Sequence, residues 1–324
     1  MKRIIPLCLA LIMTVGLLAG CGKQNEQTAS DETRLRVVTT IFPECDWVRE
    51  ILGDKADNAE VTMLLDNGAD LHSYQPTADD IVKISECDLF IYVGGESDDW
   101  VDDALKNAAN KNMKVINLLE ALGDSVKNEE VVEGMQEEEH DHEEEAEYDE
   151  HVWLSLKNAQ TLCSAISSVL QQIDPDNKDT YAANASAYIK KLSALDADYQ
   201  AAVNAAACKT VLFGDRFPFR YLVDDYGLRY YAAFVGCSAE SEASFETISF
   251  LAGKVDELNL PCVLTIEGVQ HKIAETIVRN TAAKNQKVLM MDSMQSTTSK
   301  DAANGTTYLS IMERNLSVLK EALG

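Results

Sequence analysis

The sequence predicts an α/β protein of two lobes with mainly parallel sheets flanked by helices, joined by one long rigid helix. Three observations lead to this fold class. From residue 35 onward, short β-branched runs alternate with segments that carry apolar residues at helical spacing, and the same alternation resumes after residue 208. Between these halves, residues 180–207 contain neither proline nor glycine. Such alternation is typical of parallel sheets covered by helices, and the uninterrupted segment is typical of a long helix.

The first half, which we assign as an N-terminal lobe over residues 35–175, contains four predicted strands. They are the runs "LRVVTT", "AEVTMLL", "DLFIYV" and "KVINL". Predicted helices lie between them, in "PECDWVREILGD", "TADDIVKISE" and "DDWVDDALKNAA". Ligands bind at the carboxyl ends of parallel strands, so the loop "DNGADLHSYQPT" after the second strand is the first place to expect a site.

The middle of the chain contains an acidic segment followed by two predicted helices. Residues 123–150 are acidic and poor in apolar side chains, which predicts a mobile, solvated loop with order returning at His151. A helix is expected over about 154–172, and "DPDNKD" ends it. The linking helix is then assigned to residues 176–207, where it should act as a strut between the lobes.

The second half, residues 208–324, is assigned as a C-terminal α/β lobe. Its predicted strands are "KTVLF", "LRYYAAFV", "PCVLTIE" and "KVLMMD". Its predicted helices are "FPFRYLVDDYG", "SFETISFLAGKVDELN", "QHKIAETIVRNTAAK" and the terminal "TTYLSIMERNLSVLKEAL".

The N-terminus predicts export and a lipid anchor. Lys2 and Arg3 precede an apolar stretch that is too short to span a bilayer comfortably, and residues 1–20 are assigned as a signal peptide. The sequence "LAGC" has the features of a bacterial lipobox, with Cys21 as the acylated residue and residues 21–34 as a spacer. An ordinary secretory signal with a chance cysteine is the alternative. The expected location is the outer face of the bacterial cell membrane.

Charge and cysteine content exclude several classes of function. A formal net charge of −26 repels phosphate backbones, so nucleic acid is not expected as a partner, whereas cations are attracted. Apart from Cys8 and Cys21, the six cysteines are scattered singly and form no CxxC pair, which argues against a zinc ribbon and a disulfide scaffold. A single bridge between Cys208 and Cys262 stays open at this point.

Three residues at predicted strand ends or loop edges could bind a metal ion. His72 lies in the loop after the second strand, His151 precedes "VWLS" at the end of the acidic segment, and Asp292 ends the strand "KVLMM". Two imidazoles and a carboxylate suit zinc or manganese better than calcium or magnesium. Spacing along the chain does not tell whether the three side chains converge.

From about Arg36 to the C-terminus the chain resembles the zinc- and manganese-binding solute receptors of bacterial ABC metal importers. The resemblance rests on "GADLHSYQPTADDIVKISECDLFIYVG", "EHVWLS", "IEGVQHKIAETI" and "VLMMDSM", which occur in the family's order. It implies a monomeric, non-enzymatic receptor that holds a divalent metal ion in the cleft between its lobes and delivers it to a membrane permease. It also implies that His72, His151 and Asp292 are direct metal ligands.

One position departs from the family pattern. The family draws a further histidine or glutamate ligand from the helix start after the first strand of the C-terminal lobe, where this chain has Arg216. Arginine stays protonated and has no lone pair to donate. Asp215 is the first candidate to replace it, followed by Glu267 or water. Arg216 itself should point away from the metal or pair with a carboxylate.

The two remaining groups of histidines have separate interpretations. His140 and His142, in "EEEHDHEEE", lie where zinc receptors of this family carry a variable acidic, histidine-rich loop, which could capture zinc loosely. A solvated acidic loop with two incidental histidines would have the same composition. His271 is interpreted as a surface residue at a helix start.

Three further functional classes carry less support from the sequence. A zinc-dependent hydrolase would fit an open coordination position, but no HExxH or GxSxG motif is present. The chain could also be an adhesin-type lipoprotein, although no adhesive module is recognisable, or a receptor for manganese. Zinc is preferred because imidazole ligands bind zinc more strongly than manganese.

Overall fold

The computed structural model describes residues 34–136, 147–238, 242–268 and 271–324. Residues 35–324 form one compact unit. The signal peptide, Cys21 and the pair His140 and His142 fall outside the described residues. Within the described ranges, no helix is both long enough and apolar enough to cross a membrane.

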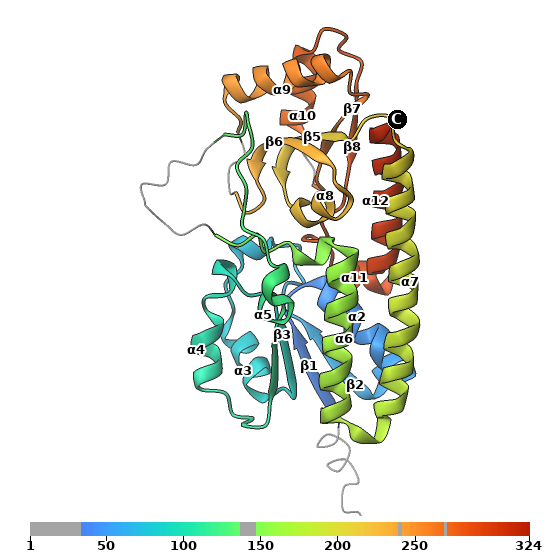
Figure 1. Ribbon diagram of the computed structural model, residues 1–324. Coiled ribbons are helices and arrows are strands. Elements are labelled where there is room, and N and C mark those ends of the chain that lie inside the picture. Colours follow the sequence, from blue (N-terminus) through green and yellow to red (C-terminus); the bar gives the residue numbers. More distant parts are fainter. Residues whose placement is uncertain (1–33, 137–146, 239–241, 269–270) are drawn as a thin grey trace, which may run out of the picture. The chain divides into compact units, whose positions relative to one another are not determined.

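The first lobe is built on a parallel four-stranded sheet in the order β2-β1-β3-β4 (Figure 1). Its strands are β1 (Leu35–Thr39), β2 (Ala59–Met63), β3 (Leu89–Tyr92) and β4 (Lys114–Asn117). Its helices are α2 (Phe42–Leu52), α3 (Ala78–Glu86), α4 (Val101–Lys106) and α5 (Leu118–Leu122). The four predicted strands are therefore confirmed. The short helix α5, capped by the Asn117 side chain, was not predicted, because five residues are too few to show a helical period.

The second lobe repeats this architecture with the parallel order β6-β5-β7-β8. Its strands are β5 (Thr210–Phe217), β6 (Arg229–Val235), β7 (Cys262–Thr265) and β8 (Lys287–Met290). The helices of this half are α8 (Arg220–Tyr226), α9 (Phe245–Leu258), α10 (Lys272–Asn280), α11 (Ser299–Ala303) and α12 (Tyr308–Leu323). Arg216 lies within β5 and pairs with Phe234 of β6, so it does not begin a helix as the sequence suggested. The register of this pairing shifts between Phe213 and Arg216.

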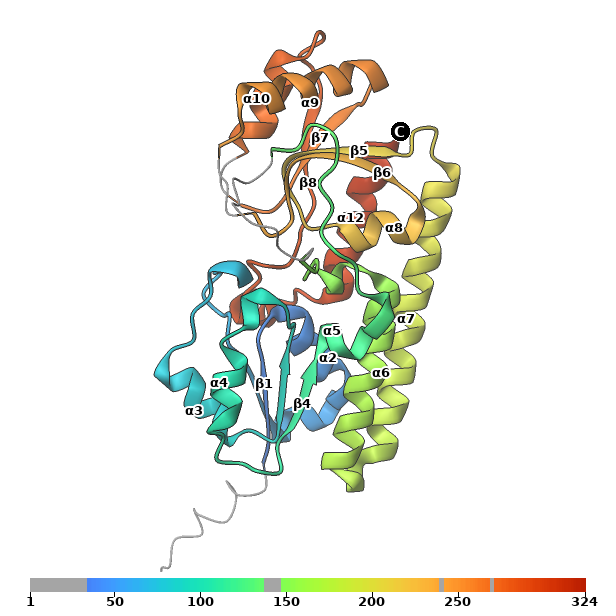
Figure 2. The same ribbon diagram turned by 60° about the vertical axis from the view of Figure 1, so that its left-hand side comes forward.

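A long helix connects the two sheets. Helix α6 (Leu156–Ile173) runs antiparallel to α7 (Lys178–Ala205), a helix of 28 residues that runs from beside the first sheet to beside the second (Figures 1 and 2). At 1.5 Å per residue α7 is about 42 Å long. Its buried side chains recur every three or four positions and run from Tyr181 to Val203. Near its end, the Tyr199 hydroxyl donates a hydrogen bond to the Met312 carbonyl on α12, at 2.6 Å. The two-lobe α/β architecture with one long helix is thus confirmed.

The described parts of the acidic segment are more ordered than the sequence predicted. Asp149 and Glu150 are buried, and the Asp149 carbonyl accepts a hydrogen bond from the Tyr221 hydroxyl on α8, at 2.8 Å. The Gln136 backbone N–H donates to the Ala233 carbonyl of β6, at 2.9 Å. Composition does not predict this order because the partners of these acidic residues come from distant strands and helices.

The cysteines that the structure describes are all free thiols. The bridge between Cys208 and Cys262 is not formed. Cys45, Cys87, Cys163 and Cys262 are buried among apolar side chains and serve as small core residues. Cys208 and Cys237 are only partly buried, and of these two only Cys237 lies beside the predicted site.

Candidate metal site

His72 lies in a short 3-10 turn, Leu71–Ser73, in the loop that follows β2. Asp70 caps this turn, because its Oδ1 accepts the His72 backbone N–H at 3.0 Å. The imidazole is held through Nδ1, which lies 2.8 Å from Ser97 Oγ and 3.4 Å from Glu150 Oε2. Nε2, on the other side of the ring, faces His151.

His151 is fully buried immediately before the 3-10 turn Val152–Leu154. Asp149 positions it twice, since Oδ1 lies 2.8 Å from the His151 backbone nitrogen and 3.0 Å from its Nδ1. The indole N–H of Trp153 donates to the Ser293 carbonyl at 2.8 Å and so ties this turn to the segment after β8.

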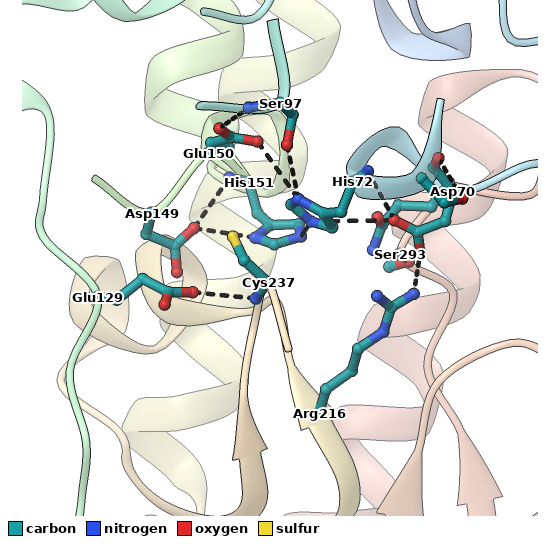
Figure 3. A network of polar contacts seen from close by, with 12 residues as sticks. Asp70, His72, Ser97, Glu129, Asp149, Glu150, His151, Arg216, Cys237 and Ser293 are labelled. Atoms are coloured by element: carbon teal, nitrogen blue, oxygen red, sulfur yellow. Dashed lines mark hydrogen bonds and ion pairs between the residues drawn. The ribbon is translucent and has the colours of Figure 1, made fainter. Parts of the chain in front are cut away.

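The two histidines meet through their Nε2 atoms, which are 3.3 Å apart (Figure 3). Each Nδ1 has an oxygen partner, so the tautomer that donates from Nδ1 leaves a lone pair on Nε2 of both rings. Two lone pairs that face one another at this distance repel unless a proton or a cation lies between them. Two nitrogens bound to one tetrahedral zinc ion are about 3.4 Å apart, given zinc–nitrogen distances of about 2.0–2.1 Å. The pair therefore has the spacing of a metal site.

Burial and the neighbouring His151 lower the pKa of His72 to about 3. At neutral pH the ring is therefore neutral, which is the state that can bind a metal ion. The carboxylates behind the two rings are buried as well, and burial raises the pKa of Glu150. Histidines backed by carboxylates in this way are typical of metal sites, because the carboxylate fixes the ring and makes it a better donor.

Cys237 is the third potential ligand in the group. Its thiol and one ring nitrogen each of His72 and His151 all lie within 4.8 Å of one another. Cys237 was not among the candidates that the sequence suggested. Its position two residues after the end of β6 was an available signal, because that is the edge of a parallel sheet at which ligands bind.

Asp292 and Asp215, by contrast, are not part of this close group. Asp292 Oδ1 accepts the Met294 backbone N–H at 2.9 Å, and burial together with Glu267 raises the pKa of Asp292 to about 6. Asp215 Oδ2 accepts a hydrogen bond from the Thr265 hydroxyl at 2.6 Å. Glu267 accepts the Ser293 backbone N–H at 2.6 Å and the Ser293 hydroxyl at 2.7 Å. Each of these carboxylates already has protein donors.

Arg216 points to Asp70, with which its guanidinium forms an ion pair (Figure 3). Burial would raise the pKa of Asp70, but the Arg216 guanidinium outweighs it and holds that pKa below its usual value. The carboxylate that neutralises Arg216 is thus Asp70 and not the adjacent Asp215.

A cavity of about 860 Å³ opens beside His72. The cavity is lined by the His72 loop of the first lobe and by β5, α10 and the loops around them in the second. Its polar lining residues include Asp70, His72, Asp215, Arg216, Ser238, Glu267 and His271. His271 stands at the N-cap of α10, the helix start that the sequence predicted, and is partly exposed there, with Nδ1 3.1 Å from the Thr265 hydroxyl. Because His72 lines this cavity, an ion could reach the pair from it.

Comparison with protein families gives one match that spans almost the whole described chain. The family described as "Zinc-uptake complex component A periplasmic" matches residues 37–322. The match covers both lobes, the connecting helix and all the residues of the candidate site.

Two curated relatives are named for zinc, one for binding it and one for its uptake. The zinc-binding lipoprotein AdcA of Streptococcus pneumoniae is 32% identical over 326 residues, covering 99% of this chain and 61% of the relative. The chain therefore spans about three fifths of the length of that relative. The high-affinity zinc uptake system protein ZnuA of Bacillus subtilis is 30% identical over 317 residues, covering 95% of this chain and 94% of the relative.

Solved structures agree with the fold. The Zn(II)-bound ZnuA-like domain of Streptococcus pneumoniae AdcA superimposes with a TM-score of 0.69 at 30% identity, covering 90% of this chain and 99% of that domain. The metal-dependent lipoprotein YcdH of Bacillus subtilis gives a TM-score of 0.72 at 28% identity, with 90% and 99% of the two chains covered.

Proposed function

Because this chain belongs to the family of periplasmic component A of zinc-uptake complexes, we propose that it captures zinc outside the cytoplasm and delivers it to an ABC permease. On this proposal the protein binds the ion and hands it over, and it catalyses no chemical reaction. It includes anchoring through an acylated Cys21, which rests on the sequence alone.

The observation that carries this proposal is the pair of Nε2 atoms 3.3 Å apart on His72 and His151. Each ring is oriented from behind by an oxygen, Ser97 Oγ for His72 and Asp149 Oδ1 for His151. When both rings carry their proton on Nδ1, the two Nε2 lone pairs face each other, and a bound cation removes the repulsion between them. The arrangement is thus preorganised for a metal ion.

The charge around the pair supports a cation. Asp149, Glu150 and Glu129 lie on one side of it, and the whole chain carries a formal net charge of −26. Arg216 is the nearby positive charge, and its ion pair with Asp70 limits its repulsion of a bound dication.

His72 and His151 are the ligands that the geometry favours, and Asp292 stays a proposal from the sequence resemblance. The Trp153–Ser293 hydrogen bond keeps the segment that carries Asp292 next to the segment that carries His151. Asp215 is the weaker candidate because its carboxylate already accepts the Thr265 hydroxyl. Two imidazole ligands favour zinc over manganese.

Uptake of labelled zinc by the bacterium that produces this protein tests the proposal. A strain that lacks the gene should take up zinc slowly at low zinc concentration, and the wild-type gene should restore uptake while a His151→Ala gene should not. Equal uptake in all three strains would contradict the proposal. A metal-dependent esterase or peptidase rate of the purified protein would instead support the hydrolase.

A further inference from the structure

We propose that Cys237 binds the zinc ion directly, as a thiolate, together with His72 and His151. This proposal rests on the proposed function, since it names a ligand of the same site. It assigns to Cys237 the position that Arg216 cannot fill and for which the sequence first suggested Asp215.

The backbone around Cys237 lies directly against the buried histidine. A Cβ atom placed on Gly236 would come within 3.0 Å of both Cε1 and Nδ1 of the His151 ring, and within 3.0 Å of the Phe217 carbonyl oxygen. A side chain at this position would push the imidazole or the Phe217 carbonyl away by a few tenths of an ångström. Gly236 thus lets β6 end against the imidazole, and the next residue along the chain is Cys237.

The Cys237 side chain is directed toward the two rings. Figure 3 shows its sulfur beside the His151 imidazole, and the three ligand atoms of the group lie within 4.8 Å of one another. In a tetrahedral site, with zinc–sulfur at about 2.3 Å and zinc–nitrogen at about 2.0–2.1 Å, sulfur and nitrogen are separated by about 3.6 Å. A movement of the thiol on the order of 1 Å therefore brings all three atoms to binding distance.

A second contact fixes this residue from behind. The Cys237 backbone N–H donates to Glu129 Oε1 at 2.9 Å, and Glu129 lies in the segment that leads toward Asp149 and His151. Asp149 and Glu129 therefore hold the two neighbouring ligands in the same way, each by accepting a backbone N–H. This is the kind of support that metal ligands receive from the residues around them.

Binding converts the thiol to a thiolate. The S–H bond breaks, the sulfur lone pair forms the bond to zinc, and the proton leaves to solvent, so each bound ion releases one proton from this residue. No oxidant or reductant takes part. Thiolate is a soft ligand that suits zinc and not manganese, so Cys237 should also sharpen the choice between these metals.

Zinc X-ray absorption spectroscopy of the zinc-loaded wild-type protein tests this directly and needs no variant. The expected spectrum contains one sulfur neighbour at about 2.3 Å besides nitrogen and oxygen neighbours at about 2.0–2.1 Å. Cys237→Ser should lose the sulfur signal, bind zinc about tenfold or more weakly, and discriminate less against manganese. Cys208→Ser is the matched control, because Cys208 is also half-buried and free but lies outside the group.

The outcomes separate this inference from the proposed function. A protein that binds zinc tightly with no sulfur neighbour, and that is unaffected by Cys237→Ser, would overturn the role of Cys237 and leave the zinc receptor standing. A wild-type protein that binds no zinc would overturn the proposed function itself. Loss of the sulfur signal in Cys208→Ser as well would also count against Cys237.

Discussion

The carboxylate of Asp70 joins Arg216 to His72: one oxygen pairs with the guanidinium, and the other accepts the His72 backbone N–H at 3.0 Å. The arginine that replaces a potential ligand thus supports the loop that presents another ligand. It also connects β5 of the second lobe to the loop after β2 of the first, across the cavity beside the site.

Arg216→Ala should lower the free energy of unfolding by about 1–3 kcal/mol, because it leaves the mostly buried Asp70 carboxylate without its charged partner. Zinc affinity should fall with it, since the His72 loop is less well held. The control is Arg36→Ala, which breaks an exposed pair with Glu86 and should cost at most about 1 kcal/mol. Chemical denaturation measures both, and equal losses would show that the Arg216 pair contributes no more than a surface pair.

Asp149→Asn should weaken zinc binding by about ten- to a hundredfold, the usual effect of removing the carboxylate behind a metal-binding histidine. The asparagine oxygen can still accept one hydrogen bond, but it supplies no negative charge to the Nδ1–H of His151. Asp198→Asn, an exposed carboxylate on α7, should leave affinity unchanged. Calorimetric titration measures both variants, and an unchanged affinity in Asp149→Asn would remove Asp149 from the site.

The buried Asp46 predicts a pH dependence that does not involve the metal. Its Oδ2 accepts the Tyr308 backbone N–H at 3.0 Å, and burial raises its pKa to about 6 from the ordinary value of 3.8. The folded protein then holds more protons than the unfolded chain between these values, so the contribution of Asp46 to stability falls as pH rises from about 4 to 6.

Asp46→Asn should remove this trend. The free energy of unfolding of the wild type, minus that of the variant, should fall by up to about 1.4 kcal/mol per pH unit in this window, measured with a chelator present. Asp198→Asn should show no such trend. A difference that rises with pH would mean that the folded state stabilises ionised Asp46, contrary to this account.

Deletion of residues 137–146 should leave the tight zinc site intact and remove only weak additional zinc equivalents. His140 and His142 lie in the deleted stretch, whereas His72 and His151 belong to the described core. The deletion keeps Gln136, whose backbone N–H bonds to β6, and Glu147, whose carbonyl accepts the Glu129 N–H. Calorimetry that shows loss of the tight site would refute this division of roles.

Much of the fold could be predicted from the sequence because its signals are local. The β-branched runs became β1 to β8, and the segment without proline or glycine became α7. His72 and His151 could also be predicted as candidate ligands, since each stands at a recognisable boundary between a loop and an ordered element.

The rest of the site depends on contacts between distant segments, which no local pattern encodes. Cys237 lies near His151 because the end of β6 comes close to the imidazole, and Gly236 leaves room for this approach. Arg216 pairs with Asp70, 146 positions away, and not with its neighbour Asp215. Asp149 and Glu150 looked like part of a solvated acidic run, although both are buried behind the histidines.

We propose that this chain binds zinc through the pair of His72 and His151. A competition titration with zinc and manganese tests this, on the wild type and on His72→Ala, His151→Ala, Asp292→Ala and Asp215→Ala, with His271→Ala as the histidine control. The wild type should bind one zinc ion tightly and manganese more weakly. Zinc affinity should be lost in His72→Ala and His151→Ala but retained in His271→Ala. Asp292→Ala should weaken binding and Asp215→Ala should change it little. Tight zinc binding that survives both His72→Ala and His151→Ala, or manganese binding tighter than zinc, would show that the histidine pair is not a zinc site.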